Sequence, residues 1–189
     1  MPKKILLVGN TGFSLLHFRK ALIRSIIDSG YNLVVAFNDE GGFSTRFSQL
    51  GCRAIPLPIK HKSMNPVSDA LLTKSLLKIY RLEKPDIVHH FTIKPVLYGS
   101  IAAKIVGVPT IVNTITGLGY SFERRGLLQY IASNLYRVAL RGSPATIFQN
   151  RDDLSYFTNN KLVASDRAKL ILGSGVNTEQ IRPDPKPHD

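Results

Sequence analysis

The chain has 189 residues, and 25 Lys and Arg residues outnumber 13 Asp and Glu residues to give a formal net charge of +12. With 43% hydrophobic residues, this length predicts one globular domain with a substantial core and excludes an intrinsically disordered chain. The single cysteine, Cys52, excludes an internal disulfide framework and a cysteine-based zinc site.

The basic composition favours an anionic partner, such as an anionic lipid surface or a phosphorylated substrate. A solvated basic surface without a dedicated partner stays open as an alternative. Nucleic acid is not expected, because the sequence has no zinc finger and no RNA-binding pattern of paired aromatic residues. No apolar stretch approaches the roughly 20 residues that span a bilayer, so we expect a soluble protein or one that sits on a membrane surface.

Apolar runs and helical patterns alternate along the whole chain. The predicted strands are residues 3–8, 31–37, 52–58, 86–91, 110–114, 144–150 and 168–172. The predicted helices are residues 15–29, 43–50, 66–82, 95–106, 127–141 and 151–158. This alternation predicts an α/β fold with three layers, in which a doubly wound, Rossmann-like parallel sheet of about seven strands lies between two layers of helices. The prolines in the third strand favour an edge position for it.

The first predicted strand ends in the glycine turn Gly9-Asn10-Thr11-Gly12. The turn lacks the third glycine of a dinucleotide-binding fingerprint, and no acidic residue follows the second strand, where Phe37 and Asn38 stand. It also lacks the Gly-Lys-Ser/Thr end of a phosphate loop. Its glycines either let backbone amides approach a phosphate or sugar, or serve only a tight structural turn. The residues alone leave both readings open.

Three later strand ends carry candidate ligand-binding residues. His89 and His90 end the fourth strand; neighbours on a strand face opposite sides, so the two cannot easily share a metal, and a structural role for each stays open. The loop Thr116-Gly117-Leu118-Gly119-Tyr120 either wraps a polyhydroxylated ligand or is a flexible connection, and Arg124-Arg125 follow it. Gly173-Ser174-Gly175 ends the seventh strand. No Ser-His-Asp arrangement, nucleophile elbow or paired metal carboxylates are found.

Four segments, taken in this order and spacing, carry a resemblance to a known family. They are Gly9-Asn10 with Phe18-Arg19, then Lys84-Pro85-Asp86-Ile87-Val88-His89, then residues 113–120, and then Gly173-Ser174-Gly175-Val176-Asn177 with Ile181-Arg182-Pro183. Together they resemble the N-terminal half of a GT-B-fold glycosyltransferase. The group 4 class is the most similar, a retaining class that builds bacterial surface polysaccharides such as capsule or lipopolysaccharide, and lipid-linked oligosaccharides.

The resemblance implies that this domain binds the acceptor, which is a glycan or a polyprenyl-diphosphate-linked molecule, whereas a C-terminal domain binds a nucleoside-diphosphate sugar as co-substrate. The residues that it implies for the acceptor pocket are His17, Phe18, Arg19, His90, Lys94, Thr116, Gly117, Gly119 and Tyr120. Those that it implies for the donor phosphates are Gly9, Asn10, Thr11, Gly12, Gly173, Ser174 and Gly175. The basic surface, with Lys60, Lys62, Arg124 and Arg125, would then suit an anionic membrane that holds a polyprenyl-diphosphate-linked acceptor. Neither a metal nor a cofactor is expected, since retaining transfer needs none when protein groups stabilise the diphosphate.

One residue departs from the pattern of this family. Many relatives carry a histidine in the loop after the fifth strand, where this sequence has Thr116. Thr116 is therefore the candidate catalytic residue, although a threonine hydroxyl can only donate or accept a hydrogen bond and cannot act as a general base near neutral pH.

The resemblance assigns residues 1–181 to the acceptor-binding domain and the proline-rich residues 182–189 to a linker or tail. The donor-binding residues would lie in a C-terminal domain that this chain lacks, so we expect the chain alone not to transfer sugar. We expect the whole enzyme to be cytoplasmic and peripheral on the inner face of the cell membrane. A non-catalytic lipid- or glycan-binding module of the same fold and a self-contained nucleotide-binding domain stay open as alternatives.

Overall fold

The computed structural model describes residues 2–59, 65–118 and 126–175. Its centre is a parallel sheet of seven strands in the order β3-β2-β1-β4-β5-β6-β7. The strands are β1 (Lys4–Thr11), β2 (Asn32–Asn38), β3 (Arg53–Pro56), β4 (Ile87–Phe91), β5 (Thr110–Ile115), β6 (Ala145–Phe148) and β7 (Ala168–Leu170). The predicted fold class is confirmed, and so is the edge position of β3, which pairs only with β2.

The helices connect these strands in chain order. They are α1 (Gly12–Phe18), α2 (Lys20–Asp28), α3 (Phe43–Gln49), α4 (Pro66–Glu83), the π-helical turn η1 (Pro95–Gly99), α5 (Ser100–Val106), α6 (Leu127–Leu140), α7 (Arg151–Asn159) and the 3-10 turn η3 (Ser165–Arg167). The helix predicted over 15–29 begins earlier and is divided in two. Thr11 caps its start by accepting a hydrogen bond from the Ser14 N–H at 3.2 Å, and Arg19 leaves the helical region with φ −126° and ψ 10°.

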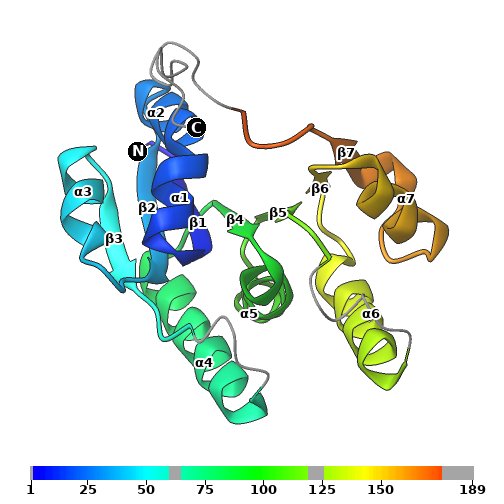
Figure 1. Cartoon of the computed structure of the whole chain (residues 1–189). Coiled ribbons are helices and arrows are strands. Elements are labelled where there is room, and N and C mark those ends of the chain that lie inside the picture. Colours follow the sequence, from blue (N-terminus) through cyan, green and yellow to red (C-terminus); the bar gives the residue numbers. More distant parts are fainter. Residues whose placement is uncertain (1, 60–64, 119–125, 176–189) are drawn as a thin grey trace, which may run out of the picture.

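The helices form two layers, one on each face of the sheet (Figure 1). Helices α1, α2 and α3 pack on one face around Leu15, Ile23 and Phe47. Helices α4 and α5 cover the other face, and α6 and α7 continue that layer towards the β7 edge. Right-handed crossovers give this arrangement, because the chain first steps from β1 towards β3 and then from β4 towards β7.

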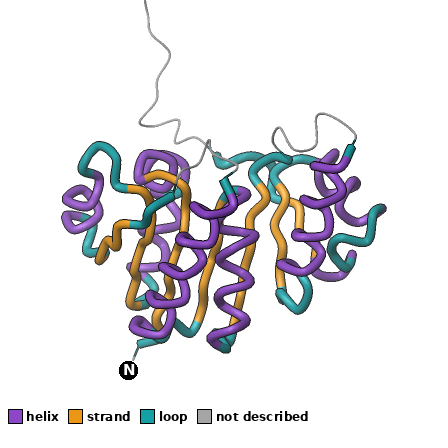
Figure 2. The backbone as a smooth tube through the Cα atoms, turned by 90° about the horizontal axis from the view of Figure 1, so that it is seen from below, coloured by secondary structure: helices purple, strands orange, loops and turns teal. Residues whose placement is uncertain are grey.

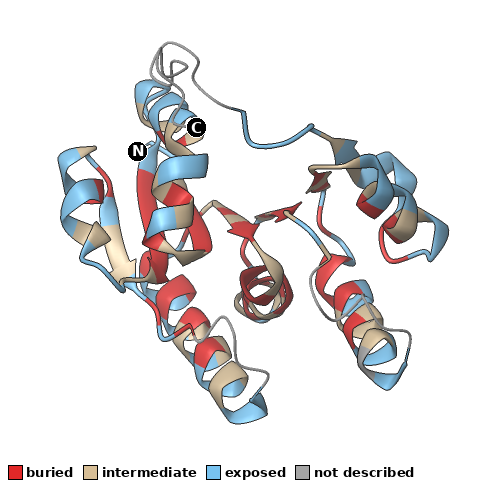
Figure 3. Cartoon of the chain, viewed as in Figure 1, coloured by how far each residue is buried: buried red, intermediate tan, exposed pale blue. Residues whose placement is uncertain are grey.

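The core lies where the two layers meet the sheet, and the buried residues follow the strands and the inner sides of the helices (Figure 3). Seen from below, the strands run side by side, and the connections between them lie at the two ends of the strands (Figure 2). Ligands of such sheets bind at the carboxyl ends of the strands, so we expect a site there. Among the described residues, no helix combines the length and the apolar character needed to cross a bilayer.

Candidate functional site

A cavity of about 260 Å³ opens at the carboxyl ends of the strands. It lies between α1 and the ends of β4, β5 and β6. Its lining residues are Ser14, Leu15, Phe18, Arg19, Phe91, Thr92, Thr116, Gln149 and Ser174. Four of these, Phe18, Arg19, Thr116 and Ser174, are site residues predicted from the sequence, and they come from segments up to 156 positions apart (174 minus 18).

Arg19 is the charged side chain of this cavity. Its Nη1 donates a hydrogen bond to Ser174 Oγ at 2.8 Å, and its guanidinium lies 4.8 Å from the centroid of the Phe91 ring. None of the ion pairs within the described part of the chain involves Arg19. Burial lowers the pKa of Arg19, but a guanidinium stays protonated in proteins. The cavity therefore holds a partly desolvated cation without a carboxylate partner among the described residues, and such a cation attracts anions.

Gln149, which follows β6, supports the opposite wall. Its Nε2 donates to the Gly173 carbonyl at 2.9 Å and to Ser174 Oγ at 3.1 Å. The Gly173 N–H donates back to the Gln149 carbonyl at 3.1 Å. Sequence reasoning missed Gln149, although a polar residue at the end of a buried strand is a signal that could have found it. Gly173 and Gly175 are exposed beside this wall and do not line the cavity.

The glycine turn predicted from the sequence forms the end of β1 and the first residue of α1, and its glycines contribute mainly through close packing. A Cβ on Gly12 would lie 2.4 Å from Phe43 Cβ and 2.8 Å from Phe37 Cε2, and a Cβ on Gly9 would lie 2.7 Å from Leu15 Cγ. Both glycines are therefore required by the approach of α1 to its neighbours, which supports the structural reading for them. Between them, Asn10 and Thr11 end β1, and Thr11 caps α1. None of the four turn residues lines the cavity, so their role towards donor phosphates stays a prediction.

His17 and Phe18 lie side by side on α1 but have different surroundings. Phe18 is 52% exposed and lines the cavity. His17 stacks on Phe13 with ring centroids 4.1 Å apart, and its Nδ1 lies 2.9 Å from the Phe13 carbonyl oxygen. Phe43 of α3 meets both rings edge-on. His17 is thus part of an exposed aromatic cluster (Phe13, His17, Phe18 and Phe43) and not of the cavity wall.

The structure places His90 away from the cavity, on the face covered by α4 and α5. The side chain is fully buried, with Nε2 2.8 Å from the Tyr80 hydroxyl and Nδ1 3.0 Å from Asn113 Oδ1. Since a carbonyl oxygen can only accept, Nδ1 carries the proton and Nε2 accepts from Tyr80. Burial lowers the pKa of His90 to about 4. This environment is that of a satisfied core histidine, and it does not bring His90 to an acceptor.

His89 instead faces the cavity side of the sheet, although the sequence analysis did not assign it to the acceptor pocket. Its ring stacks on Phe91 at 4.2 Å, and its Nε2 lies 2.8 Å from Thr114 Oγ1. The pKa of His89 is lowered to about 3, mainly by burial and further by the charges of the nearby His90 and Arg19. The neutral His89 ring therefore stacks on Phe91, and the Arg19 guanidinium lies over the same Phe91 ring.

Lys94 also lies away from the cavity. Its Nζ pairs with Asp69 Oδ1 of α4 at 2.5 Å, and the Tyr98 hydroxyl donates to Asp69 Oδ2 at 2.7 Å. The ion pair is nearly buried and links η1 to α4. In the loop after β5, Thr116 lines the cavity, while Gly117 is exposed. The predicted residues Gly119, Tyr120, Lys60, Lys62, Arg124 and Arg125 lie outside the described residues.

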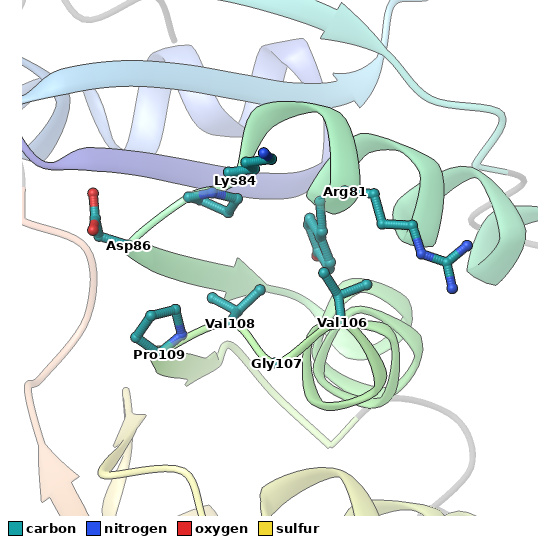
Figure 4. Close-up of a pocket in the computed structure, with 9 residues that line it drawn as sticks. Arg81, Lys84, Asp86, Val106, Gly107, Val108 and Pro109 are labelled. Carbon is teal, nitrogen blue, oxygen red and sulfur yellow. The ribbon is translucent and has the colours of Figure 1, made fainter.

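A second cavity, of about 440 Å³, opens at the amino ends of the strands, on the opposite side of the sheet from the first cavity (Figure 4). Lys84, Pro85 and Asp86 line it, together with the turn after α5. Lys84 ends α4 in a left-handed conformation with φ 46°, and the Asp86 carboxylate accepts the Lys4 N–H at 2.7 Å. This segment, one of those that carried the resemblance, therefore joins α4 and β4 to β1 and lies far from the strand ends where the candidate site is found.

Comparison with known families matches residues 4–150 to the Glycosyl transferase 4-like family. A curated relative from Escherichia coli, UDP-Gal:alpha-D-GlcNAc-diphosphoundecaprenol alpha-1,3-galactosyltransferase, is 27% identical over 145 residues, which are 76% of this chain and 37% of that protein. The chain thus spans well under half the length of this relative.

Solved structures share the fold at low sequence identity. The HepE protein of Anabaena, in complex with UDP and glucose, superposes with a TM-score of 0.67 at 17% identity, over 97% of this chain and 47% of that one. The UDP-N-acetylglucosamine 2-epimerase of Rickettsia bellii superposes with a TM-score of 0.65 at 13% identity, over 92% of this chain and 46% of that one. Because a transferase-like family and an epimerase share it, the fold alone does not separate these activities. The family match covers most of the chain, and on that ground the chain belongs to the Glycosyl transferase 4-like family and has the fold of one half of a GT-B glycosyltransferase.

Proposed function

We propose that this chain is the acceptor-binding half of a retaining glycosyltransferase, with residues 1–181 as the domain and 182–189 as the linker. The enzyme transfers a sugar from a nucleoside-diphosphate sugar to a polyprenyl-diphosphate-linked acceptor at the cytoplasmic surface of the cell membrane. The curated relative supports the class of donor and acceptor, because its name states a UDP-sugar and a diphosphoundecaprenol-linked acceptor. The chain's own basic composition suits anionic substrates and membranes.

The observation that carries this proposal is Arg19 in the cavity at the carboxyl ends of the strands. The resemblance implied Arg19 for the acceptor pocket, and we propose that it also faces the donor diphosphate. In sugar transfer, the bond between the sugar and the diphosphate oxygen breaks as the acceptor oxygen bonds to the sugar. Negative charge grows on the departing diphosphate, which then takes the proton that the acceptor hydroxyl loses. A desolvated cation that already lies in place stabilises such charge without reorganisation. Ser174 accepts from Arg19 and Gln149, which holds the guanidinium at the cavity wall. Thr116 can hydrogen-bond a substrate hydroxyl from the adjoining strand end.

The test uses the chain together with any coding sequence that follows Asp189. UDP-galactose with N-acetylglucosamine-diphosphoundecaprenol is the first donor and acceptor pair to try, followed by a panel of other nucleotide sugars. We expect transfer by the extended protein and none by residues 1–189 alone. Arg19→Gln should lower kcat/KM on the order of a hundredfold, because it removes one preorganised donor and its charge.

Arg24→Gln on α2 is the matched control, since Arg24 is an exposed arginine outside the cavity. It should leave kcat/KM unchanged. Equal activity of Arg19→Gln and the parent would remove Arg19 from the site. An extended protein that binds acceptor but transfers no sugar would favour a non-catalytic lipid- or glycan-binding module.

A further inference from the structure

Helix α6 presents two apolar faces, and only one of them packs against the protein. Ala132, Tyr136, Ala139 and Leu140 are buried beside η1 and α7. On the opposite side, Leu127, Ile131 and Val138 are 75%, 46% and 57% exposed. Their spacing of four and then seven residues places them on one stripe of the helix. A helix that is apolar on both sides is normally buried on both, so this exposed face calls for a cover.

The same helix ends at a groove that is strongly basic. The groove has a volume of about 520 Å³, and the described residues that line it include four cations, Arg137, Arg141, Lys161 and Arg167, and no acidic residue. All four cations are exposed, and none takes part in the ion pairs of the described residues. The C-terminal ends of α6 and α7 meet here, and each contributes about half a negative charge. Four cations exceed that sum by about three charges, so the groove attracts anions.

Two of these cations, Arg137 and Arg141, belong to the last turn of α6 itself. Arg137 follows Tyr130 by seven residues, so the two lie above one another on the helix, beside the apolar stripe. Tyr130 is itself 68% exposed. The 14 residues of α6 include no Asp or Glu. An apolar stripe bordered by an aromatic residue and arginines, without acids, is the chemistry of a helix that lies at the interface of an anionic bilayer.

We propose that the outer face of α6 and the adjoining groove form the surface by which this chain contacts an anionic lipid bilayer. Leu127, Ile131 and Val138 enter the interface, and the groove cations meet lipid phosphates. The inference rests on the proposed function, in which the acceptor is held in the membrane. In a parallel sheet each connecting helix runs from the carboxyl ends of the strands back to their amino ends, so α6 begins on the side where the cavity lies and ends at the groove on the other side.

The test measures co-sedimentation of residues 1–189 with vesicles, without any nucleotide sugar. One set of vesicles contains equal parts of phosphatidylglycerol and phosphatidylcholine, and the other contains phosphatidylcholine alone. We expect binding to the anionic vesicles only. Arg137→Gln with Arg141→Gln should weaken it by about fivefold for each cation removed. The matched control, Lys20→Gln with Arg24→Gln on α2, removes the same charge from the other helical layer and should weaken binding far less.

Leu127→Ser with Ile131→Ser tests the apolar stripe, and should reduce the binding that remains at high salt. Leu127 is 75% and Ile131 46% exposed, so the unfolding midpoint should fall only slightly, and its measurement checks that the variants are folded. Equal losses in the two cation variants would overturn the assignment to α6. If inorganic phosphate at equal charge competes with the vesicles, the groove is a site for free anions. If the chain binds no vesicles but forms a dimer that Ile131→Ser abolishes, the surface binds a second copy of the chain. Sugar transfer with no vesicle binding would refute this surface alone, whereas vesicle binding without transfer would refute only the proposed catalysis.

Discussion

His89 and His90 show how one step along a strand decides the role of a residue. The pleat of β4 turns His90 into the core, where Tyr80 and Asn113 satisfy both ring nitrogens. It turns His89 to the other face, where the ring stacks on Phe91 beneath Arg19. Both side chains are neutral at pH 7, because burial lowers the pKa of each well below that of a free histidine.

These two histidines should make the stability of the protein depend on pH. The pKa is lowered to about 3 for His89 and to about 4 for His90, whereas an unfolded histidine titrates near 6.5. Between these values the unfolded chain binds protons that the folded chain does not. As far as these histidines decide it, the free energy of unfolding should thus be highest above about pH 6.5. It should fall with acidification by up to about 1.4 kcal/mol per pH unit for each histidine.

Urea unfolding at about pH 7, 6 and 5 measures this dependence. A His89→Gln variant should show a shallower decline than the parent, whatever its absolute stability. A free energy of unfolding that rises or stays level between pH 7 and 5 would contradict the neutral state of both side chains in the folded protein.

At the scale of elements, an ion pair joins two helices on the same face of the sheet. Lys94 precedes η1, and its ammonium reaches Asp69 in the first turn of α4, where Tyr98 also donates to the carboxylate. Asp69 thereby serves both as a favourable charge at a helix N-terminus and as the partner of a nearly buried cation. The pair orients η1, from which Val96 and Leu97 enter the core shared with α6 and α7.

Asp69→Asn should destabilise the protein by about 3 kcal/mol, because it leaves the Lys94 ammonium buried without a counter-charge. The double variant Asp69→Leu with Lys94→Met should cost clearly less, since it removes both charges together. Chemical denaturation of Asp69→Leu, Lys94→Met and the double variant gives the coupling free energy. Additive losses would show that the two side chains do not interact in solution.

At the scale of the whole molecule, the chain is one sheet with two helical layers and a cavity at one edge. Among the described residues that line the cavity, Arg19 alone is charged. The cavity volume of about 260 Å³ is small beside the roughly 300–1,000 Å³ of typical ligand pockets. A nucleotide sugar would therefore depend on further contacts, which the proposed second domain supplies.

UDP should accordingly bind the extended protein much more tightly than residues 1–189 alone. We expect the dissociation constant to differ by at least a hundredfold, about 2.7 kcal/mol, measured by isothermal titration calorimetry at matched salt. Equal affinity of the two proteins would instead support a self-contained nucleotide-binding domain.

Local patterns in the sequence were sufficient for the fold class. Apolar runs such as Ile5 to Val8 and helical spacing such as Leu72 and Leu76 depend on neighbours in the chain, and their alternation leaves few topologies. The division of the first helix at Arg19 escaped detection, since the residues on both sides of Arg19 keep the same helical spacing. The π-helical turn at Pro95–Gly99 also escaped detection, because its residues continue the helical pattern of the helix predicted over 95–106.

The candidate site was predictable only in part. The sequence by itself determined that strand ends would carry it, with Thr116 and Ser174 at two of them, and the family resemblance added Arg19 from the first predicted helix. Only the tertiary structure decided that these three meet in one cavity, that Gln149 joins them, and that His90 and Lys94 turn into the protein. The physical reason is that a side chain's surroundings depend on strand order and on the face that each helix layer covers, and both are set by contacts between residues far apart in the chain.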